Sequence, residues 1–83
     1  MRASAKYPIV DDKSDTIETF CESERISRSA YFDMRRQGWG PDEMRIGRLI
    51  RISPEAKARW RRQRERAAAL GIRGALPVSE LSP

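Results

Sequence analysis

Two helix-start signals lie close together in this sequence, and their spacing constrains the fold more than any other feature. Thr16 and Ser27 are both favourable N-cap residues, because their hydroxyl oxygens can accept a hydrogen bond from the free N–H groups of a first helical turn. A helix that follows Thr16 must end between Glu22 and Glu24 to leave room for a turn before Ser27. We therefore expect two short helices joined by a tight turn.

Apolar residues at helical spacing support both helices. On the first helix they are Ile17, Phe20 and Cys21. On the second they recur every four residues and have an aromatic neighbour: Ile26, Ala30 and Met34, with Tyr31 or Phe32. The second helix is expected to end at Gln37, because Gly38 readily adopts the left-handed conformation that terminates helices. Two short helices joined in this way are typical of a helix-turn-helix.

A β-hairpin is predicted after this pair of helices. Gly47-Arg48 separates two short segments of apolar and basic residues, and glycine suits the first position of a two-residue hairpin turn. The residues expected to face the core are Met44, Ile46, Ile50 and Ile52. Those expected to project outward are Arg45, Arg48 and Arg51. A hairpin in this position would form a small wing beside the helix-turn-helix.

A third helix is predicted to begin at Ser53-Pro54, where serine can cap the helix and proline fits its first turn. It is expected to run to about Leu70 and to end at Gly71. Its apolar stripe is thin and consists of Ala56, Trp60 and Ala67. The fold therefore depends on Trp60 as the anchor of this helix.

These elements predict a mainly α fold with a small β-hairpin, a winged helix-turn-helix of three helices plus a wing. A chain of 83 residues is enough for one small domain. We expect a loose N-terminal arm over residues 1–14, the domain over residues 15–70 and a disordered C-terminal tail over residues 71–83.

Positive charge is concentrated in one part of the chain. The whole sequence has a net charge of +5, whereas residues 45–68 contain nine Lys or Arg residues against Glu55 and Glu65. Most of the positive residues are arginine, and the lysines are Lys6, Lys13 and Lys57. Arginine forms planar, bidentate hydrogen bonds with phosphates and guanine edges, so its excess favours a polyanionic partner. An arginine-rich composition that reflects a GC-rich genome is the alternative explanation.

The residue types needed for several kinds of catalysis are missing. The sequence has no histidine and one cysteine, Cys21, which excludes internal disulfides, the usual zinc ligand sets and histidine-dependent nucleophilic catalysis. We therefore predict no catalytic residues, metal, cofactor or small-molecule substrate, and we do not expect an enzyme. No apolar stretch is long enough for a membrane span or a secretory signal, so we expect a cytoplasmic protein.

Five motifs follow one another between residues 16 and 60. They are the N-capped first helix at Thr16, ISRS at 26–29, GWGP at 38–41, RIGR at 45–48, and ISPEA at 52–56 followed by Trp60. In order and spacing they resemble the small MerR-like winged-helix proteins of phages and prophages, which include excisionases and AlpA-type regulators. The resemblance covers just over half of the chain. Asp33 and Trp39 depart from it, because the family often has a basic or polar residue at the first position and a small or basic one at the second.

The resemblance implies that the second helix enters the major groove of DNA and that the wing reaches the neighbouring backbone or minor groove. The matching residues on the reading helix are Ser27, Arg28, Ser29, Arg35 and Arg36. Those on the wing are Arg45, Gly47 and Arg48, to which the outward Arg51 is added as a candidate for phosphate contact. Asp33 is expected either to pair with Arg36 or Gln37 or to lower affinity, and Trp39 is expected to pack against the wing.

The predicted function is sequence-specific binding of double-stranded DNA. Two roles are open: an excisionase-like recombination directionality factor, or a transcription regulator of a prophage or mobile element. The expected partners are an integrase or recombinase, or other copies of this chain on DNA, in a bacterial or phage-encoded, nucleoid-associated protein. The alternative is a protein-interaction module that docks an acidic partner through the basic third helix. RNA binding ranks last, because the chain lacks the exposed sheet aromatics that stack on single-stranded RNA.

Overall fold

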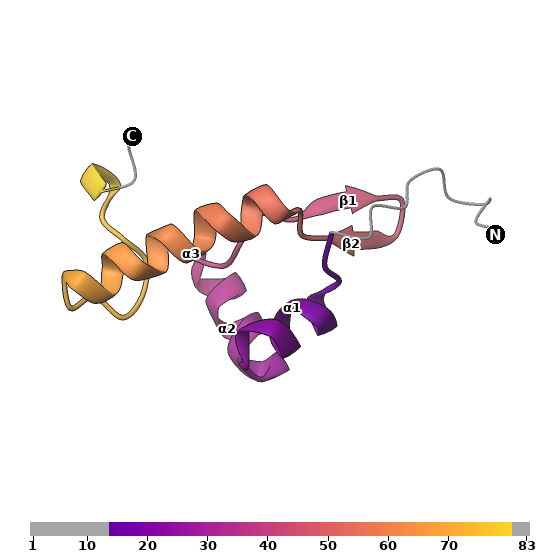
Figure 1. The fold of residues 1–83 in the computed structure, drawn as a ribbon, viewed down its shortest axis with the longest axis horizontal. Coiled ribbons are helices and arrows are strands. Elements are labelled where there is room, and N and C mark those ends of the chain that lie inside the picture. Colours follow the sequence, from indigo (N-terminus) through magenta and orange to yellow (C-terminus); the bar gives the residue numbers. More distant parts are fainter. Residues whose placement is uncertain (1–13, 81–83) are drawn as a thin grey trace.

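The computed structural model describes residues 14–80 of the chain (Figure 1). Its elements, in chain order, are α1 (Ile17–Glu24), α2 (Arg28–Gln37), β1 (Met44–Ile46), β2 (Leu49–Arg51), α3 (Pro54–Ala69) and the 3₁₀ helix η1 (Val78–Glu80). The protein is mainly helical with a two-stranded antiparallel hairpin, in a winged-helix-like arrangement, which confirms the predicted fold class. Most of the predicted N-terminal arm, 1–13, and the end of the predicted tail, 81–83, lie outside the described residues.

The three α-helices begin where predicted, because their N-cap side chains hold the first turns. Ser27 and Ser53 each accept a hydrogen bond of 3.0 Å from the backbone N–H group three residues later. Thr16 forms a reciprocal capping box with Thr19: its hydroxyl accepts from the Thr19 N–H at 3.0 Å, and its own N–H donates to the Thr19 hydroxyl at 2.9 Å. Each cap contributes about 1 kcal/mol, so local signals fix these boundaries.

Arg25 forms the tight turn between α1 and α2 in place of a glycine. Its backbone is left-handed, with a φ of 58°, a conformation that side chains other than those of Asn and Asp rarely adopt. The N–H of Arg25 donates to the Glu22 carbonyl at 3.3 Å, and the N–H of Ile26 donates to the Cys21 carbonyl at 3.0 Å. These bonds satisfy carbonyl groups at the end of α1 and hold the turn, so a helix-turn-helix forms here without a glycine.

The hairpin has the predicted two-residue turn, with Gly47 at a φ of 61°. Its cross-strand pairs are Met44 with Arg51, Arg45 with Ile50, and Ile46 with Leu49. Paired residues share a face of a sheet and successive residues alternate between faces. Arg45 therefore shares a face with Ile50, and Arg51 lies on the other face with Met44.

This register corrects the predicted faces of the hairpin. The sequence predicts one core-facing row of apolar residues, with every arginine on the other face. The structure does not have this row, because a two-residue turn pairs position 46 with position 49 across the strands. Ile52, just past β2, is fully buried, whereas Met44 is 40% exposed. The wing thus reaches the core through its base and extends away from the helices at its tip (Figure 1).

Three aromatic rings, one from each α-helix, form the centre of the core. Phe20 of α1 contacts Tyr31 of α2 and Trp60 of α3 edge to face, with ring centroids 5.6 and 5.0 Å apart. Phe20 and Tyr31 are fully buried, and Trp60 is 8% exposed. The indole N–H of Trp60 donates to the Trp39 carbonyl at 3.1 Å, so its polar group is satisfied as well. Ala30, which the sequence places on the apolar stripe of α2, is exposed instead.

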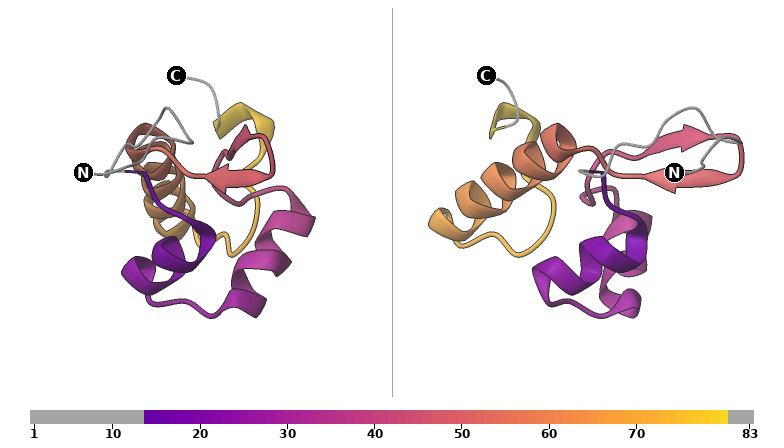
Figure 2. Two further views of the ribbon diagram at one scale, coloured as in Figure 1. Left: turned by 90° about the vertical axis from the view of Figure 1, so that its right-hand side faces the viewer. Right: turned by 45° about the vertical axis from the view of Figure 1, so that its right-hand side comes forward.

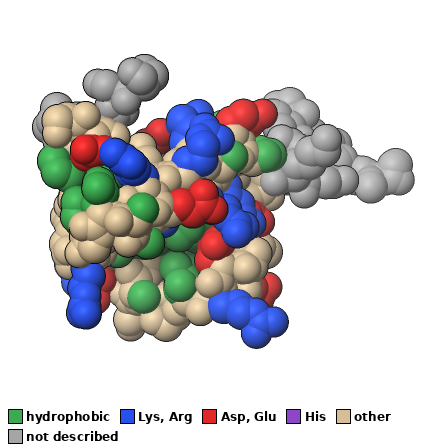
Figure 3. Space-filling view, turned by 60° about the vertical axis from the view of Figure 1, so that its left-hand side comes forward, with side chains coloured by type: hydrophobic (Ala, Val, Ile, Leu, Met, Phe, Trp, Pro, Cys, Tyr) green, Lys and Arg blue, Asp and Glu red, His purple; other side chains and the backbone are tan. Residues whose placement is uncertain are grey.

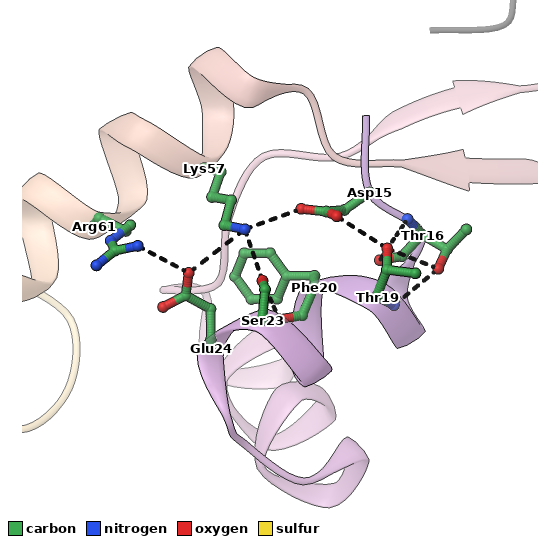
Figure 4. A network of polar contacts seen from close by, with 8 residues as sticks. All are labelled: Asp15, Thr16, Thr19, Phe20, Ser23, Glu24, Lys57 and Arg61. Atoms are coloured by element: carbon green, nitrogen blue, oxygen red, sulfur yellow. Dashed lines mark hydrogen bonds and ion pairs between the residues drawn. The ribbon is translucent and has the colours of Figure 1, made fainter. Parts of the chain in front are cut away.

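Lys57 connects α1, the segment before it, and α3 (Figure 4). Its ammonium group donates to the Ser23 hydroxyl at 2.7 Å and to the Asp15 carboxylate at 3.3 Å, and it lies 3.8 Å from the Glu24 carboxylate. Asp15 also exchanges two backbone hydrogen bonds with Ile52, of 2.9 and 2.8 Å, beside the end of β2. Lys57 therefore stabilises the fold, and its ammonium group is already bound by side chains of the protein.

Residues 71–80 fold back along α3 (Figure 1), whereas the sequence predicts a disordered tail from residue 71 onward. The N–H of Ile72 donates to the Ala67 carbonyl at 2.8 Å, and Leu76 is buried. The local composition carries no signal for this packing, because the contacts join the segment to a helix that precedes it. The prediction of disorder is thus wrong for the described part of the tail.

We expect Trp60→Ala to lower the free energy of unfolding by about 3–5 kcal/mol, because the lost indole leaves a cavity beside Phe20. Urea unfolding followed by circular dichroism measures this change. Arg62→Ala, an exposed change on the same helix, is the matched control and should stay within about 0.5 kcal/mol of the parent. A loss for Trp60→Ala below about 1 kcal/mol would show that the aromatic cluster does not anchor α3.

Candidate nucleic-acid interface

The helix α2 and the hairpin lie on the same side of α3, as the left view of Figure 2 shows. A shallow hollow of about 310 Å³ lies between the end of α2 and β1. It is lined by the end of α2, the following loop and β1: Arg35, Gly38, Gly40, Pro41, Asp42, Glu43 and Arg45. The fold therefore brings an arginine predicted for the reading helix and one predicted for the wing onto one surface.

Arg28 and Arg36 on α2 are exposed, and each is paired with an acid. Arg28 lies 3.4 Å from the Glu18 carboxylate on α1, and Arg36 pairs with Asp33 on its own helix. The two arginine side chains are 60% and 71% exposed. Exposed ion pairs contribute about 0–1 kcal/mol, so a phosphate or a guanine edge can replace either acid at small cost. The predicted pairing of Asp33 with Arg36 is confirmed.

Ser27 and Ser29 are exposed at the N-terminal end of α2. The Ser27 oxygen accepts the N-cap hydrogen bond, which leaves its hydroxyl proton available to a further acceptor. The backbone N–H groups and the dipole of a first helical turn favour negative charge at this place. Both serines can therefore contact an anion such as a phosphate.

Arg35 is held more firmly than the other predicted arginines of α2. Its guanidinium lies 3.1 Å from one carboxylate oxygen of Glu43, a side chain that is 13% exposed. The Tyr31 hydroxyl donates to the other oxygen of the same carboxylate. Burial of the phenol, followed by this hydrogen bond and the Glu43 charge, raises the pKa of Tyr31 well above its usual range. Tyr31 thus stays a donor, and Glu43 is fixed between the core and Arg35.

Phe32 also lies on this surface, although the sequence pattern indicates only a core position for it. The Arg28 and Arg35 guanidinium carbons lie 5.9 and 5.7 Å from the centroid of its ring, within reach of cation–π attraction. The ring itself is partly exposed and packs edge to face on Tyr31 at 5.4 Å. The signal was present in the spacing, because residues four before and three after an aromatic are its neighbours on a helix.

Within the described residues, the arginines of the hairpin differ from those of α2 in having no acidic partner. Arg45 and Arg48 are exposed, and in residues 14–80 no carboxylate lies within ion-pair distance of either. Arg51 donates to the neighbouring Ile50 carbonyl at 2.9 Å and lies on the opposite face from Arg45. The turn between the strands therefore presents one uncompensated cation, and β1 presents another.

The basic helix α3 carries less free charge than its sequence suggests. Its arginines form ion pairs with acids from other parts of the chain: Arg59 with Asp42 at 3.1 Å, Arg61 with Glu24 at 3.5 Å and Arg66 with Glu80 at 2.8 Å. The space-filling view shows Lys and Arg side chains interspersed with Asp and Glu on the face in sight (Figure 3). Arg62 is exposed and has no acidic partner within the described chain.

Trp39 packs against α3 and the C-terminal segment, which corrects the prediction that it packs against the wing. The Arg64 guanidinium lies over its ring at 4.5 Å and donates to the Gly74 carbonyl at 2.8 Å. Burial lowers the pKa of Arg64. Trp39 therefore helps to fasten residues 71–80 to the domain.

No cluster of three or more potential metal ligands occurs within residues 14–80. In the same part of the chain, no helix has the length and apolar character needed to cross a bilayer. No protein-family model, curated protein or solved structure matches this chain. The resemblance to excisionases and AlpA-type regulators therefore stays a prediction from the motifs.

The raised pKa of Tyr31 predicts a loss of stability at alkaline pH. The unfolded chain releases this proton near the ordinary tyrosine pKa of about 10, whereas the folded protein keeps it to higher pH. Above that pH the free energy of unfolding should fall, by up to about 1.4 kcal/mol per pH unit, and below it this contribution is complete. Urea unfolding across the range, compared with Tyr31→Phe, measures the effect. Equal pH slopes in the two proteins would contradict it.

Proposed function

We propose that this chain binds duplex DNA in a sequence-specific manner, without catalysis, through α2 and the hairpin. The observation that carries the proposal is the shared surface on which Arg35 of α2 and Arg45 of β1 line one hollow. A helix of this length fits the major groove, and a hairpin beside it can follow the adjacent backbone. Cations from two elements on one side of a small protein suit a double helix better than a compact ligand.

The ion pairs support a division of tasks between the two elements. Arg45 and Arg48 meet no competing acid in the described chain, so they are suited to phosphates, which fix position and register. Arg28 and Arg36 must exchange an acid for their new partner, and a bidentate contact with a guanine edge compensates for that exchange. Affinity is thus assigned mainly to the hairpin, and sequence preference mainly to α2.

Either an excisionase-like directionality factor or a regulator of a mobile element is compatible with this surface. One domain of this size reads a short site, so useful specificity requires repeated sites with several copies, or a second protein such as an integrase. We also place the protein in the cytoplasm, because the DNA that it would bind is chromosomal or phage DNA.

A protein-interaction module based on α3 is the second candidate, and Arg62 is the feature that favours it, because this exposed arginine has no acidic partner in the described chain. Two observations weigh against it. Trp60, the aromatic side chain of this helix, is 8% exposed and committed to the core. The neighbouring Arg59 and Arg61 are already paired with Asp42 and Glu24.

Selection of bound duplexes from a random DNA pool tests the proposal directly. We expect the parent protein to enrich a motif at near-physiological salt, and the double variant Arg28→Ala/Arg36→Ala to bind DNA with a weakened or altered motif. Each lost bidentate base contact should reduce discrimination by about 1–3 kcal/mol at its position. Folding of both proteins is checked by circular dichroism. A folded parent that enriches no motif would refute sequence-specific binding.

The double variant Arg45→Ala/Arg48→Ala should weaken binding to all duplexes to a similar extent. Each lost phosphate contact contributes about 0.9 to the slope of log K against log salt, so the slope should become shallower by nearly 2. Arg62→Ala/Arg73→Ala removes the same charge from exposed positions outside the hairpin and should leave the slope nearly unchanged. If that control instead loses DNA binding while the hairpin variant keeps it, α3 and not the wing is the contact surface.

A further inference from the structure

We infer that Phe32 is a specificity-determining residue that contacts the 5-methyl group of a thymine, between bases read by Arg28 and Arg35. This inference rests on the proposed binding of duplex DNA through α2. The three side chains form one strip, because both guanidinium groups lie within 6 Å of the Phe32 ring centroid: 5.9 Å for Arg28 and 5.7 Å for Arg35. A ligand that fits this strip would present flat hydrogen-bond acceptor groups to the two arginines and a methyl group to the ring between them.

Packing against the core accounts for only part of the Phe32 side chain, which is partly buried there and partly exposed. Tyr31, its neighbour, is fully buried and fills the position between the helices, whereas Phe32 is partly exposed and packs on the outside of that ring. An aromatic side chain that leaves part of its ring in water loses part of the hydrophobic gain of burial. Arg28 and Arg35 beside the ring also disfavour its burial against a large apolar surface. A polar ligand with a small apolar group therefore fits this position better.

Each of the two arginines has an acidic partner from another part of the chain. Glu18 of α1 lies 3.4 Å from Arg28, and Glu43 of the loop after α2 lies 3.1 Å from Arg35. Glu43 is itself held by the Tyr31 hydroxyl, so at least the second guanidinium has a set orientation before any ligand arrives. A preorganised cation beside the ring, here Arg35, favours a ligand of fixed geometry, such as the floor of a major groove, over a flexible acidic peptide.

The chemistry of the major groove matches this order of groups. Guanine presents two acceptors, N7 and O6, to an arginine, and thymine presents a methyl group that apolar side chains contact. The strip therefore predicts a binding site in which a thymine stands next to guanines, on the same or on the opposite strand. The methyl group is the distinctive element, because arginine contacts alone would not distinguish thymine from uracil.

Uracil substitution tests the inference with the parent protein. The duplex most enriched from a random pool is synthesised with each thymine in turn replaced by uracil, which removes the methyl group and leaves the pairing edge intact. We expect one thymine at which uracil weakens binding about fourfold, the value of roughly one buried methyl group, and no effect at the others. If a motif is enriched and no thymine shows this loss, the inference fails while the proposed function stands; if no motif is enriched, both fail.

Two variants assign the methyl dependence to Phe32. With Phe32→Ala the fourfold difference between thymine and uracil should disappear, whereas Phe32→Leu, which keeps an apolar side chain, should retain part of it. Circular dichroism and urea unfolding identify any variant that does not fold. Persistence of the full difference in folded Phe32→Ala would assign the methyl contact to another residue and overturn the inference.

Discussion

The edge-to-face packing of Phe20 with Tyr31 and Trp60 is the contact on which the remaining structure depends. The three rings come from α1, α2 and α3, so one cluster joins all of the long elements. The other buried side chains of the described residues are aliphatic or small, such as Met34, Ile52 and Ala56, and none of them contributes a ring to the cluster. The outer faces are left to arginines and acids, and the position of each of these depends on the cluster beneath them.

Ion pairing then determines which cations remain available to a partner. Residues 45–68 contain the excess of positive charge, but within α3 the arginines at 59, 61 and 66 are matched by acids brought in from the loop after α2, from α1 and from the C-terminal segment. No acid of the described chain pairs with the arginines of the hairpin, so these arginines remain unpaired while most of those on α3 are not. Local charge in the sequence is therefore a poor guide to local charge on the surface.

Much of the fold was predictable because short-range chemistry determines it: Thr16, Ser27 and Ser53 cap helices through bonds to residues three positions away. What the sequence did not reveal depends on long-range contacts. Trp39 packs on Arg64 and beside the C-terminal segment, and Glu43 folds back onto Arg35, through loop conformations that no local signal specifies. The hairpin faces are not a case of long-range contacts. The cross-strand register follows from the predicted two-residue turn, and the prediction of the faces was wrong because it placed the apolar residues of both strands in a single row. For the candidate site, the sequence identified the exposed arginines and the pairing of Arg36 with Asp33, but neither the acidic partners of Arg28 and Arg35 nor the place of Phe32 on this surface.

The link from Tyr31 through Glu43 to Arg35 joins the core directly to the candidate DNA surface. A buried phenol donates to a carboxylate that in turn holds an arginine, so a shift of α2 against α1 changes the surface as well as the interior. Removing the phenol oxygen would free one side of Glu43 and leave Arg35 with a less defined orientation. Under the proposed binding of DNA, stability and sequence preference would therefore be coupled, because Tyr31, which anchors α2, also positions Arg35 through Glu43.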